Sequence, residues 1–226
     1  YVVTEPLGEG GMGEVWAASD ARLQRQVAIK LLKPGSGAWQ RGRFLREAQL
    51  TARLDHPNIV PVHDLDASPD GRPFFSMKRV RGRSLEELLR AGELGSLIAR
   101  LQLFLKVCDA VSFAHAEGVV HLDLKPANVM VGEFGQVYLM DWGVARWIEE
   151  EALRVASNED DDERVIGTTG LMPPEQARGA PLDERADVFA VGALLYNILT
   201  RRPPFRGETG VQALTAALLC RFPTPE

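Results

Sequence analysis

Four polar side chains that could act on a phosphate group lie close together in the chain: Asp123, Lys125, Asn128 and Asp141. Apolar runs at 129–131 and 137–140, separated by a glycine-containing turn, predict a β-hairpin between them. This hairpin would bring two carboxylates, an amide and a lysine to one end of a rigid support. Carboxylate and amide oxygens suit a hard cation such as Mg²⁺, and a lysine neutralises phosphate charge. The pattern therefore predicts chemistry on a metal-bound phosphate.

The N-terminal part of the chain carries three glycines among predicted strands. Residues 2–4, 15–18 and 27–32 have strand-like patterns, and the glycines at 8, 10 and 13 lie between the first two of these segments. This order predicts an antiparallel meander. Glycines in such a turn let the backbone approach an anion closely, with its N–H groups directed at the charge.

The periodicity of the sequence changes near residue 80. Two further strands are predicted at 59–65 and 73–80, whereas from Ser84 onward the period is helical, beginning with a capping box between Ser84 and Glu87. Segments with helical periodicity are 41–54, 97–117, 183–200 and 211–219. The change suggests two lobes, at 1–79 and 80–226, with the site in the cleft between them.

The composition narrows the class of protein. The chain has 226 residues, 45% of them hydrophobic and 25% charged, which is ordinary for a globular protein. A net charge of -5 gives no reason to expect nucleic acid as a partner. Cys108 and Cys220 lie in apolar helical patterns and are expected to be free thiols in a reducing compartment. Because no apolar run reaches the roughly 18 residues of a membrane helix, we expect a cytoplasmic domain, which segments outside this stretch could tether to a membrane.

Together these motifs resemble those of a bacterial eukaryotic-like (Hanks-type) serine/threonine protein kinase catalytic domain, from Val2 to Phe222. The motifs that carry the resemblance are Gly8-x-Gly10-x-x-Gly13-x-Val15, Val27-Ala28-Ile29-Lys30, Asp123-x-Lys125-x-x-Asn128, Asp141-Trp142-Gly143 and Pro173-Pro174-Glu175. The resemblance implies an α+β bilobal fold. Its N-lobe would be an antiparallel sheet with one main helix, and its C-lobe would be mostly helical.

The resemblance also implies a role for each polar residue. Lys30 would contact the α- and β-phosphates of ATP and pair with Glu47. Asp123 would orient the substrate hydroxyl and accept its proton, and Lys125 would steady the γ-phosphate. Two side chains would hold Mg²⁺, or Mn²⁺ as an alternative: Asn128 and Asp141. Thr168 matches a threonine that such kinases place beside the catalytic aspartate and lysine.

The remaining nucleotide contacts implied by the resemblance are mainly apolar. Leu7, Val15 and Ala28 would sandwich the adenine base. Met77 falls at the gatekeeper position behind the base, and residues 78–80, ending at Val80, would form the hinge. The resemblance implies serine or threonine residues of proteins as substrates, including the kinase itself through autophosphorylation. It also implies that His121 is structural and that Asp187 holds the catalytic-loop backbone.

Several residues depart from the family pattern. Leu122 replaces the arginine that often binds a phosphorylated activation segment, so we expect activity that does not depend on that phosphate. Trp142 replaces phenylalanine and is expected to pack beneath the helix that carries Glu47. The acidic stretch 158–163 is expected to be a solvated surface segment. The C-terminal helices of the family are missing here, so Glu175 is expected to lack its arginine partner.

Two alternatives to a kinase have different sequence signals. A dinucleotide-binding enzyme would need a helix after the glycines, and the sequence predicts a strand there. A pseudokinase would use the same fold as an ATP-binding scaffold, and Leu122 and the missing helices favour it slightly. The kinase is favoured because the chain keeps every residue of the phosphate-transfer set, namely Lys30, Glu47, Asp123, Lys125, Asn128 and Asp141. Asp123→Asn would separate the two, because only a kinase would lose phosphate transfer.

Overall fold

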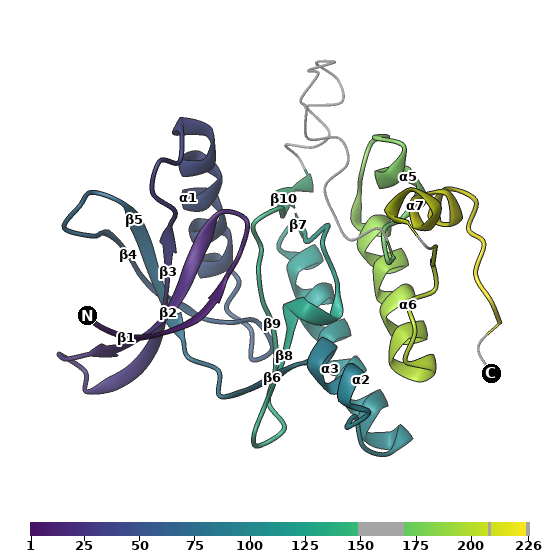
Figure 1. Cartoon of the computed structure of the whole chain (residues 1–226), viewed down its shortest axis with the longest axis horizontal. Helices are drawn as coiled ribbons and strands as arrows, with labels where there is room; N and C mark the ends of the chain where they lie inside the picture. Colours follow the sequence, from purple (N-terminus) through teal and green to yellow (C-terminus); the bar gives the residue numbers. More distant parts are fainter. Residues whose placement is uncertain (149–169, 208, 225–226) are drawn as a thin grey trace.

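The computed structural model describes residues 1–148, 170–207 and 209–224. Figure 1 shows a β-rich part on one side of the molecule and a mostly helical part on the other. This is the α+β arrangement that the sequence predicts. Two predictions lie outside the described residues, namely those for the acidic stretch 158–163 and for Thr168.

The N-terminal part is a five-stranded antiparallel sheet. Its strands, in spatial order, are β1 (Val2–Glu9), β2 (Gly13–Asp20), β3 (Arg25–Leu32), β5 (Pro73–Lys78) and β4 (Val62–Ala67). The predicted meander is thereby confirmed, including a strand rather than a helix after the glycines. The strand expected from residue 59 begins only at Val62, because Ile59 instead forms an isolated parallel bridge with Leu139.

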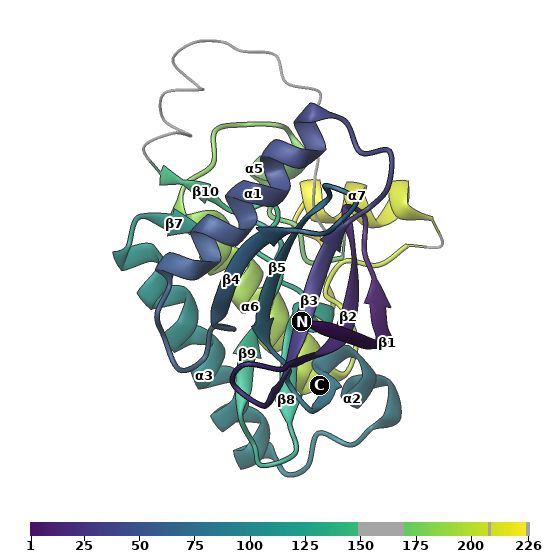
Figure 2. The same ribbon diagram turned by 90° about the vertical axis from the view of Figure 1, so that its left-hand side faces the viewer.

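Helix α1 (Ala38–Arg53) lies across one face of this sheet (Figure 2). It begins three residues before the predicted start at 41. Phe44 and Ala48 are buried against Phe75 of β5, and the rings of Phe44 and Phe75 lie 5.2 Å apart. Residues three and four apart share one face of a helix, so the packing of Phe44 and Ala48 also turns Glu47 towards the interior.

The helical part is built around a three-stranded sheet and two long helices. Its elements are β6 (Gly82–Ser84), α2 (Leu85–Ala91), α3 (Leu97–Ala116), β7 (Val119–Val120), η1 (Pro126–Asn128), β8 (Val129–Gly132), β9 (Val137–Leu139), β10 (Arg146–Trp147), α5 (Pro174–Ala177), α6 (Glu184–Thr200) and α7 (Gly210–Leu218). The predicted hairpin is β8–β9, and β6 pairs with its outer edge. The capping box of Ser84 and Glu87 is present at the start of α2.

A single large core joins the hairpin to the helices. Val107 of α3, Leu194 and Ile198 of α6 and Leu139 of β9 are fully buried in it. The hairpin is therefore packed against the helices, and Asn128 and Asp141 at its ends face the N-terminal sheet across the cleft. Of the helices in the described residues, none is both long and apolar enough to cross a membrane.

Candidate active site

A cleft of about 490 Å³ lies between the N-terminal sheet and the β8–β9 hairpin. The predicted nucleotide-binding residues that line it are Leu7, Gly8, Gly10, Val15, Ala28, Lys30, Met77, Val80, Asn128 and Asp141. Two of the predicted nucleotide-binding residues, Gly13 and Lys125, do not line the cleft. A Cβ at Gly13 would come 2.9 Å from the carbonyl oxygen of Leu31, so a glycine there lets β2 approach β3 closely.

Other lining residues carry no motif signal in the sequence. Met130 and Met140 line the cleft from the hairpin side, and Ser84 and Glu87 line it from the start of α2. The alternation of the hairpin residues could have indicated the two methionines. Ser84 and Glu87 form a capping box, so the sequence assigns them a structural role and gives no sign that they also line the cleft.

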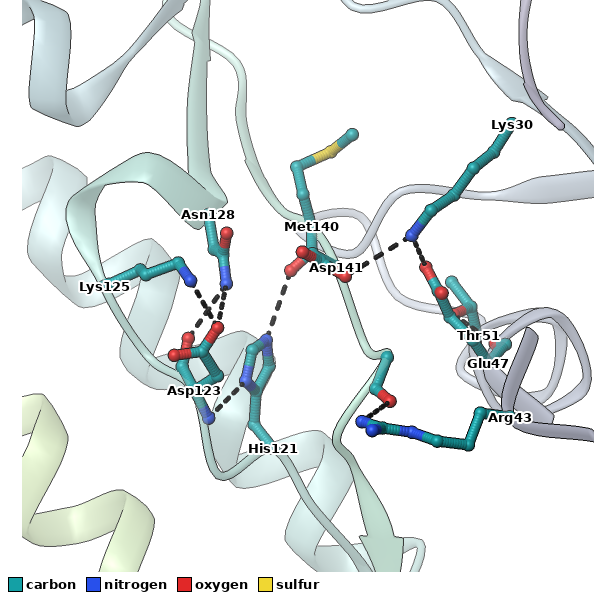
Figure 3. A network of polar contacts seen from close by, with 11 residues as sticks. Lys30, Arg43, Glu47, Thr51, His121, Asp123, Lys125, Asn128, Met140 and Asp141 are labelled. Carbon is teal, nitrogen blue, oxygen red and sulfur yellow. Dashed lines mark hydrogen bonds and ion pairs between the residues drawn. The ribbon is translucent and has the colours of Figure 1, made fainter. Parts of the chain in front are cut away.

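A buried ion pair connects the sheet to α1. The Lys30 Nζ lies 2.5 Å from Glu47 Oε1 and 3.5 Å from Asp141 Oδ1 (Figure 3). Burial lowers the pKa of Lys30, but the negative charges of Glu47 and Asp141 outweigh it, so the pKa is raised. Lys30 is therefore a fixed cation at the inner end of the cleft. Because Asp141 follows the hairpin, this lysine joins the two halves of the molecule.

The two carboxylates around Lys30 differ in environment. Burial raises the pKa of Glu47, and the charge of Lys30 only partly opposes this effect. Burial also acts on Asp141, but the charges of Lys30, His121 and Lys125, with a hydrogen bond from the Gly143 backbone, hold its pKa below the usual value. Asp141 therefore stays ionised and can bind a cation, whereas the ionised form of Glu47 depends on the charge of Lys30.

A second cluster lies on the loop before the hairpin. Lys125 Nζ lies 2.5 Å from Asp123 Oδ2. The Asn128 amide donates to the carbonyl oxygen of Asp123 at 2.9 Å and to Oδ2 at 3.3 Å. The Asn128 amide oxygen therefore points away from Asp123 (Figure 3). This arrangement fixes the Asp123 carboxylate and leaves one amide oxygen available beside it.

His121 supports this loop from below. Its buried ring accepts a hydrogen bond from the Asp123 N–H at Nδ1 and contacts the Met140 carbonyl oxygen through Nε2, each at 3.2 Å. The ring also packs on Trp142 at 4.6 Å between centroids. Because both ring nitrogens contact the backbone, the imidazole links the two polar loops and is not placed for acid–base work.

Asp187 of α6 holds the loop backbone at a strained point. Its carboxylate accepts the His121 N–H at 2.7 Å and the Leu122 N–H at 2.8 Å, and it lies 2.9 Å from His115 Nε2. Leu122 has a φ of 64°, a left-handed conformation that is costly for leucine. Two charge-assisted hydrogen bonds from a buried carboxylate can hold such a residue in place.

The Leu122 side chain packs where the family pattern has a cation. It is buried with Val120 and Ala186, and Val144 and Ile148 pack against the same cluster. The Gln176 side chain donates to the Leu122 carbonyl oxygen at 2.8 Å. Apolar contacts thus join the Asp123 loop to the segment that follows Asp141.

Trp142 is buried in the main core together with Leu50 of α1 and Leu54, the residue that follows this helix, as predicted. In the part of the chain that the structure describes, its indole Nε1 has no hydrogen-bond partner. Glu175 lies half-buried in α5, and none of the salt bridges among the described residues involves it.

Lys30, Asn128 and Asp141 thus line one cleft between the β-rich part and the helical part of the molecule. Residues 1–222 match the family model described as the protein kinase domain. The chain is 38% identical over 216 residues to serine/threonine-protein kinase PknB of Mycobacterium tuberculosis, which covers 93% of this chain. It is 33% identical over 234 residues to serine/threonine-protein kinase PknD of Protochlamydia amoebophila, covering 92%. The chain belongs to the protein kinase family.

These relatives are much longer than the matched region. The chain spans 34% of the length of the Mycobacterium tuberculosis protein and 24% of the Protochlamydia amoebophila protein. A probable serine/threonine-protein kinase of Corynebacterium efficiens, 39% identical over 214 residues, is matched over 32% of its length. The similarity therefore concerns one domain of each relative.

Replacing Asp187 with alanine tests the support of the Asp123 loop. The substitution removes both hydrogen bonds to the Leu122 region and leaves buried N–H groups unpaired, so we expect the free energy of unfolding to fall by about 3–5 kcal/mol. Urea unfolding would measure the loss. Asp183→Ala, which removes the N-cap of the same helix, is the control and should cost about 1 kcal/mol. Equal losses for the two variants would contradict the support assigned to Asp187.

Proposed function

We propose that this domain is an ATP-dependent protein kinase that transfers the γ-phosphate of Mg-ATP to serine or threonine hydroxyls of protein substrates in bacterial signalling. The observation that carries the proposal is that two polar clusters meet at one cleft, which Asn128 of the second cluster lines together with the whole first cluster. Lys30, Glu47 and Asp141 form the first, and Asp123 lies in the second with Lys125 and Asn128. The kinase names of the relatives support the reaction class.

The shape of the cleft supports adenine binding between its upper and lower walls. Leu7, Val15 and Ala28 supply apolar surface from the sheet, with Met77 and Val80 at the back and edge. Gly8 and Gly10 place backbone along the same wall, where a Cβ would otherwise stand between the N–H groups and an anion. Lys30 lies deeper and would neutralise the α- and β-phosphates.

Asn128 and Asp141 fit the requirements of a magnesium ion. The Asn128 amide oxygen is directed away from Asp123, and Asp141 has a lowered pKa and so remains an anion. Two oxygen ligands from the protein are typical of Mg²⁺ sites, in which substrate phosphates and water complete the shell; Mn²⁺ accepts the same ligands. When bound, the ion would neutralise charge on the phosphates. The protein side chains would hold their oxygens on one side of the cleft.

Asp123 is the residue we assign to the substrate hydroxyl. As the hydroxyl oxygen forms its bond to the γ-phosphorus, the bond from that phosphorus to the β–γ bridging oxygen breaks, and the hydroxyl proton passes to Asp123. Lys125, which lies against Asp123, would balance charge on the phosphate in transit. We also assign Thr168 a role in catalysis beside Asp123 and Lys125. We place the boundary between the nucleotide-binding lobe and the catalytic lobe between residues 79 and 80.

The position of Leu122 supports control that does not require a phosphate on the activation segment. A leucine in an apolar cluster offers no charge to a phosphate, and its contacts with Val144 and Ile148 already connect the two loops. Autophosphorylation would then be a by-product of activity rather than its trigger. The scaffold alternative finds no support in the described residues, because the six polar residues of the transfer set are all present.

Asp123→Asn tests the transfer reaction. Loss of the proton acceptor should lower the rate of phosphate transfer to a generic protein substrate by at least about 100-fold. The affinity for Mg-ATP should change by less than about threefold, because Asn128 and Asp141 remain. Asp183→Asn is the control, because it makes the same change at a half-buried helix N-cap outside the cleft, where asparagine caps equally well, and should keep the wild-type rate. Equal transfer by Asp123→Asn and the wild type would remove the catalytic claim.

Phosphatase treatment tests the role of Leu122. Protein treated with a broad-specificity phosphatase, and shown by mass spectrometry to carry no phosphate, should phosphorylate a substrate at an initial rate within about twofold of the mock-treated protein. The expectation follows because no arginine stands at position 122 to bind a loop phosphate. A fall of tenfold or more would show that a phosphate on the chain activates it by some other contact.

A further inference from the structure

The backbone of Gly143 joins α1 to the Asp141 carboxylate. Its N–H donates a hydrogen bond to Asp141. Its carbonyl oxygen accepts one from Arg43 Nη2 at 2.9 Å, which is the dashed line at Arg43 in Figure 3. Both sides of one residue are therefore occupied. A movement of Arg43 would shift the peptide groups that orient the Asp141 side chain.

Arg43 is placed to make this contact by the helix itself. It lies one turn before Glu47 on α1, and residues four apart share a helix face. Its guanidinium also stacks on the Trp39 ring, 4.9 Å from the centroid. Trp39, Arg43 and Glu47 thus form a row on α1. The middle member contacts the Asp141 loop, and the last pairs with Lys30.

The region around Gly143 has little room for any other arrangement. A Cβ at Gly143 would lie 3.1 Å from Asp141 Oδ1 and 3.2 Å from Glu47 Oε2. Asp141 itself has a φ of 57°, a left-handed conformation that is uncommon outside glycine although aspartate adopts it more readily than most residues. Because this region is closely packed, a small displacement of α1 must also displace Asp141.

We propose that Arg43 is a positioning residue for phosphate transfer. It fixes the Asp141 loop to α1, so that the metal-binding carboxylate and the Lys30–Glu47 pair take their working positions together. The proposal rests on the proposed kinase function and deepens it. Arg43 would act through Gly143 and would touch neither nucleotide nor substrate.

The other end of α1 is tied to the same segment. The Arg53 guanidinium lies 4.5 Å from the Trp147 ring centroid, and β10, which contains Trp147, pairs with β7 just before the Asp123 loop. Helix α1 is thus attached at Gly143 and at Trp147. Both contacts are made by unmodified side chains, so neither requires a phosphorylated residue. This explains how a kinase with leucine at position 122 could keep its active arrangement.

The test compares Arg43→Ala with Arg41→Ala. Arg41 is on the same helix and has the same charge, but among the described residues its side chain donates to the Gly71 carbonyl oxygen at 3.5 Å, and neither residue lines the cleft. For Arg43→Ala we expect kcat to fall about 10- to 100-fold, the loss typical of one charge-assisted hydrogen bond, and KM for ATP to change by less than about threefold. The Mg²⁺ concentration needed for half-maximal rate should rise. Arg41→Ala should match the wild type in all three values.

Arg43→Lys serves as the conservative variant. An ammonium group can still donate to the Gly143 carbonyl oxygen, so this variant should recover most of the lost kcat. A merely structural role for Arg43 predicts a lower melting temperature with an unchanged Mg²⁺ requirement. Finding that pattern, or finding Arg43→Ala equal to Arg41→Ala, would overturn the proposal.

Hydrogen–deuterium exchange separates this proposal from the kinase function. Arg43→Ala should speed amide exchange at residues 141–147, whereas Arg41→Ala should not. If the wild type transferred no phosphate while exchange responded in this way, the proposed function would fail and the coupling would stand. If the wild type were active and exchange at 141–147 were the same in both variants, the coupling would be wrong and the function would stand.

Discussion

The buried ion pair between Lys30 and Glu47 is the constraint on which the rest of the site depends. Both side chains are almost fully removed from water, and each would be costly to bury alone. Lys30 keeps its charge because Glu47 and Asp141 both face it. The pair therefore requires three elements at once, namely strand β3, helix α1 and the loop after β9. Any arrangement that separates one of them leaves a buried charge without its partner.

The loops on the helical side meet this requirement through strained but well-supported backbone. Leu122 and Asp141 both have left-handed φ values, and each is held by a network that reaches another element. Asp187 of α6 holds the first through N–H groups, and the hydrogen bonds around Gly143 hold the second. His121 lies between them, with one ring nitrogen contacting each loop. The cleft is thus ordered by links between loops rather than by the regularity of any strand.

The sequence predicts the long elements and the motif residues well, because each has a clear period or spacing. It does not predict β6, β7, β10 or α5, which are two to four residues long and too short to carry a period. The left-handed Leu122 could not be foreseen, since its conformation comes from the Asp187 carboxylate and not from leucine. The contact of Arg43 with a backbone carbonyl oxygen leaves no trace in residue type at position 143. Gly13 matches the phosphate-loop pattern, yet it lies against β3.

A double-mutant cycle at Lys30 and Glu47 tests most directly whether the ion pair acts as one unit in phosphate transfer. The rate would be measured as kcat/KM for ATP in Lys30→Met, Glu47→Gln and the double variant. If the two residues act as one unit, kcat/KM for ATP of the double variant should be no more than about tenfold below that of the less active single variant. Losses that multiply across the two single variants would mean that Lys30 and Glu47 act independently, and would contradict this account.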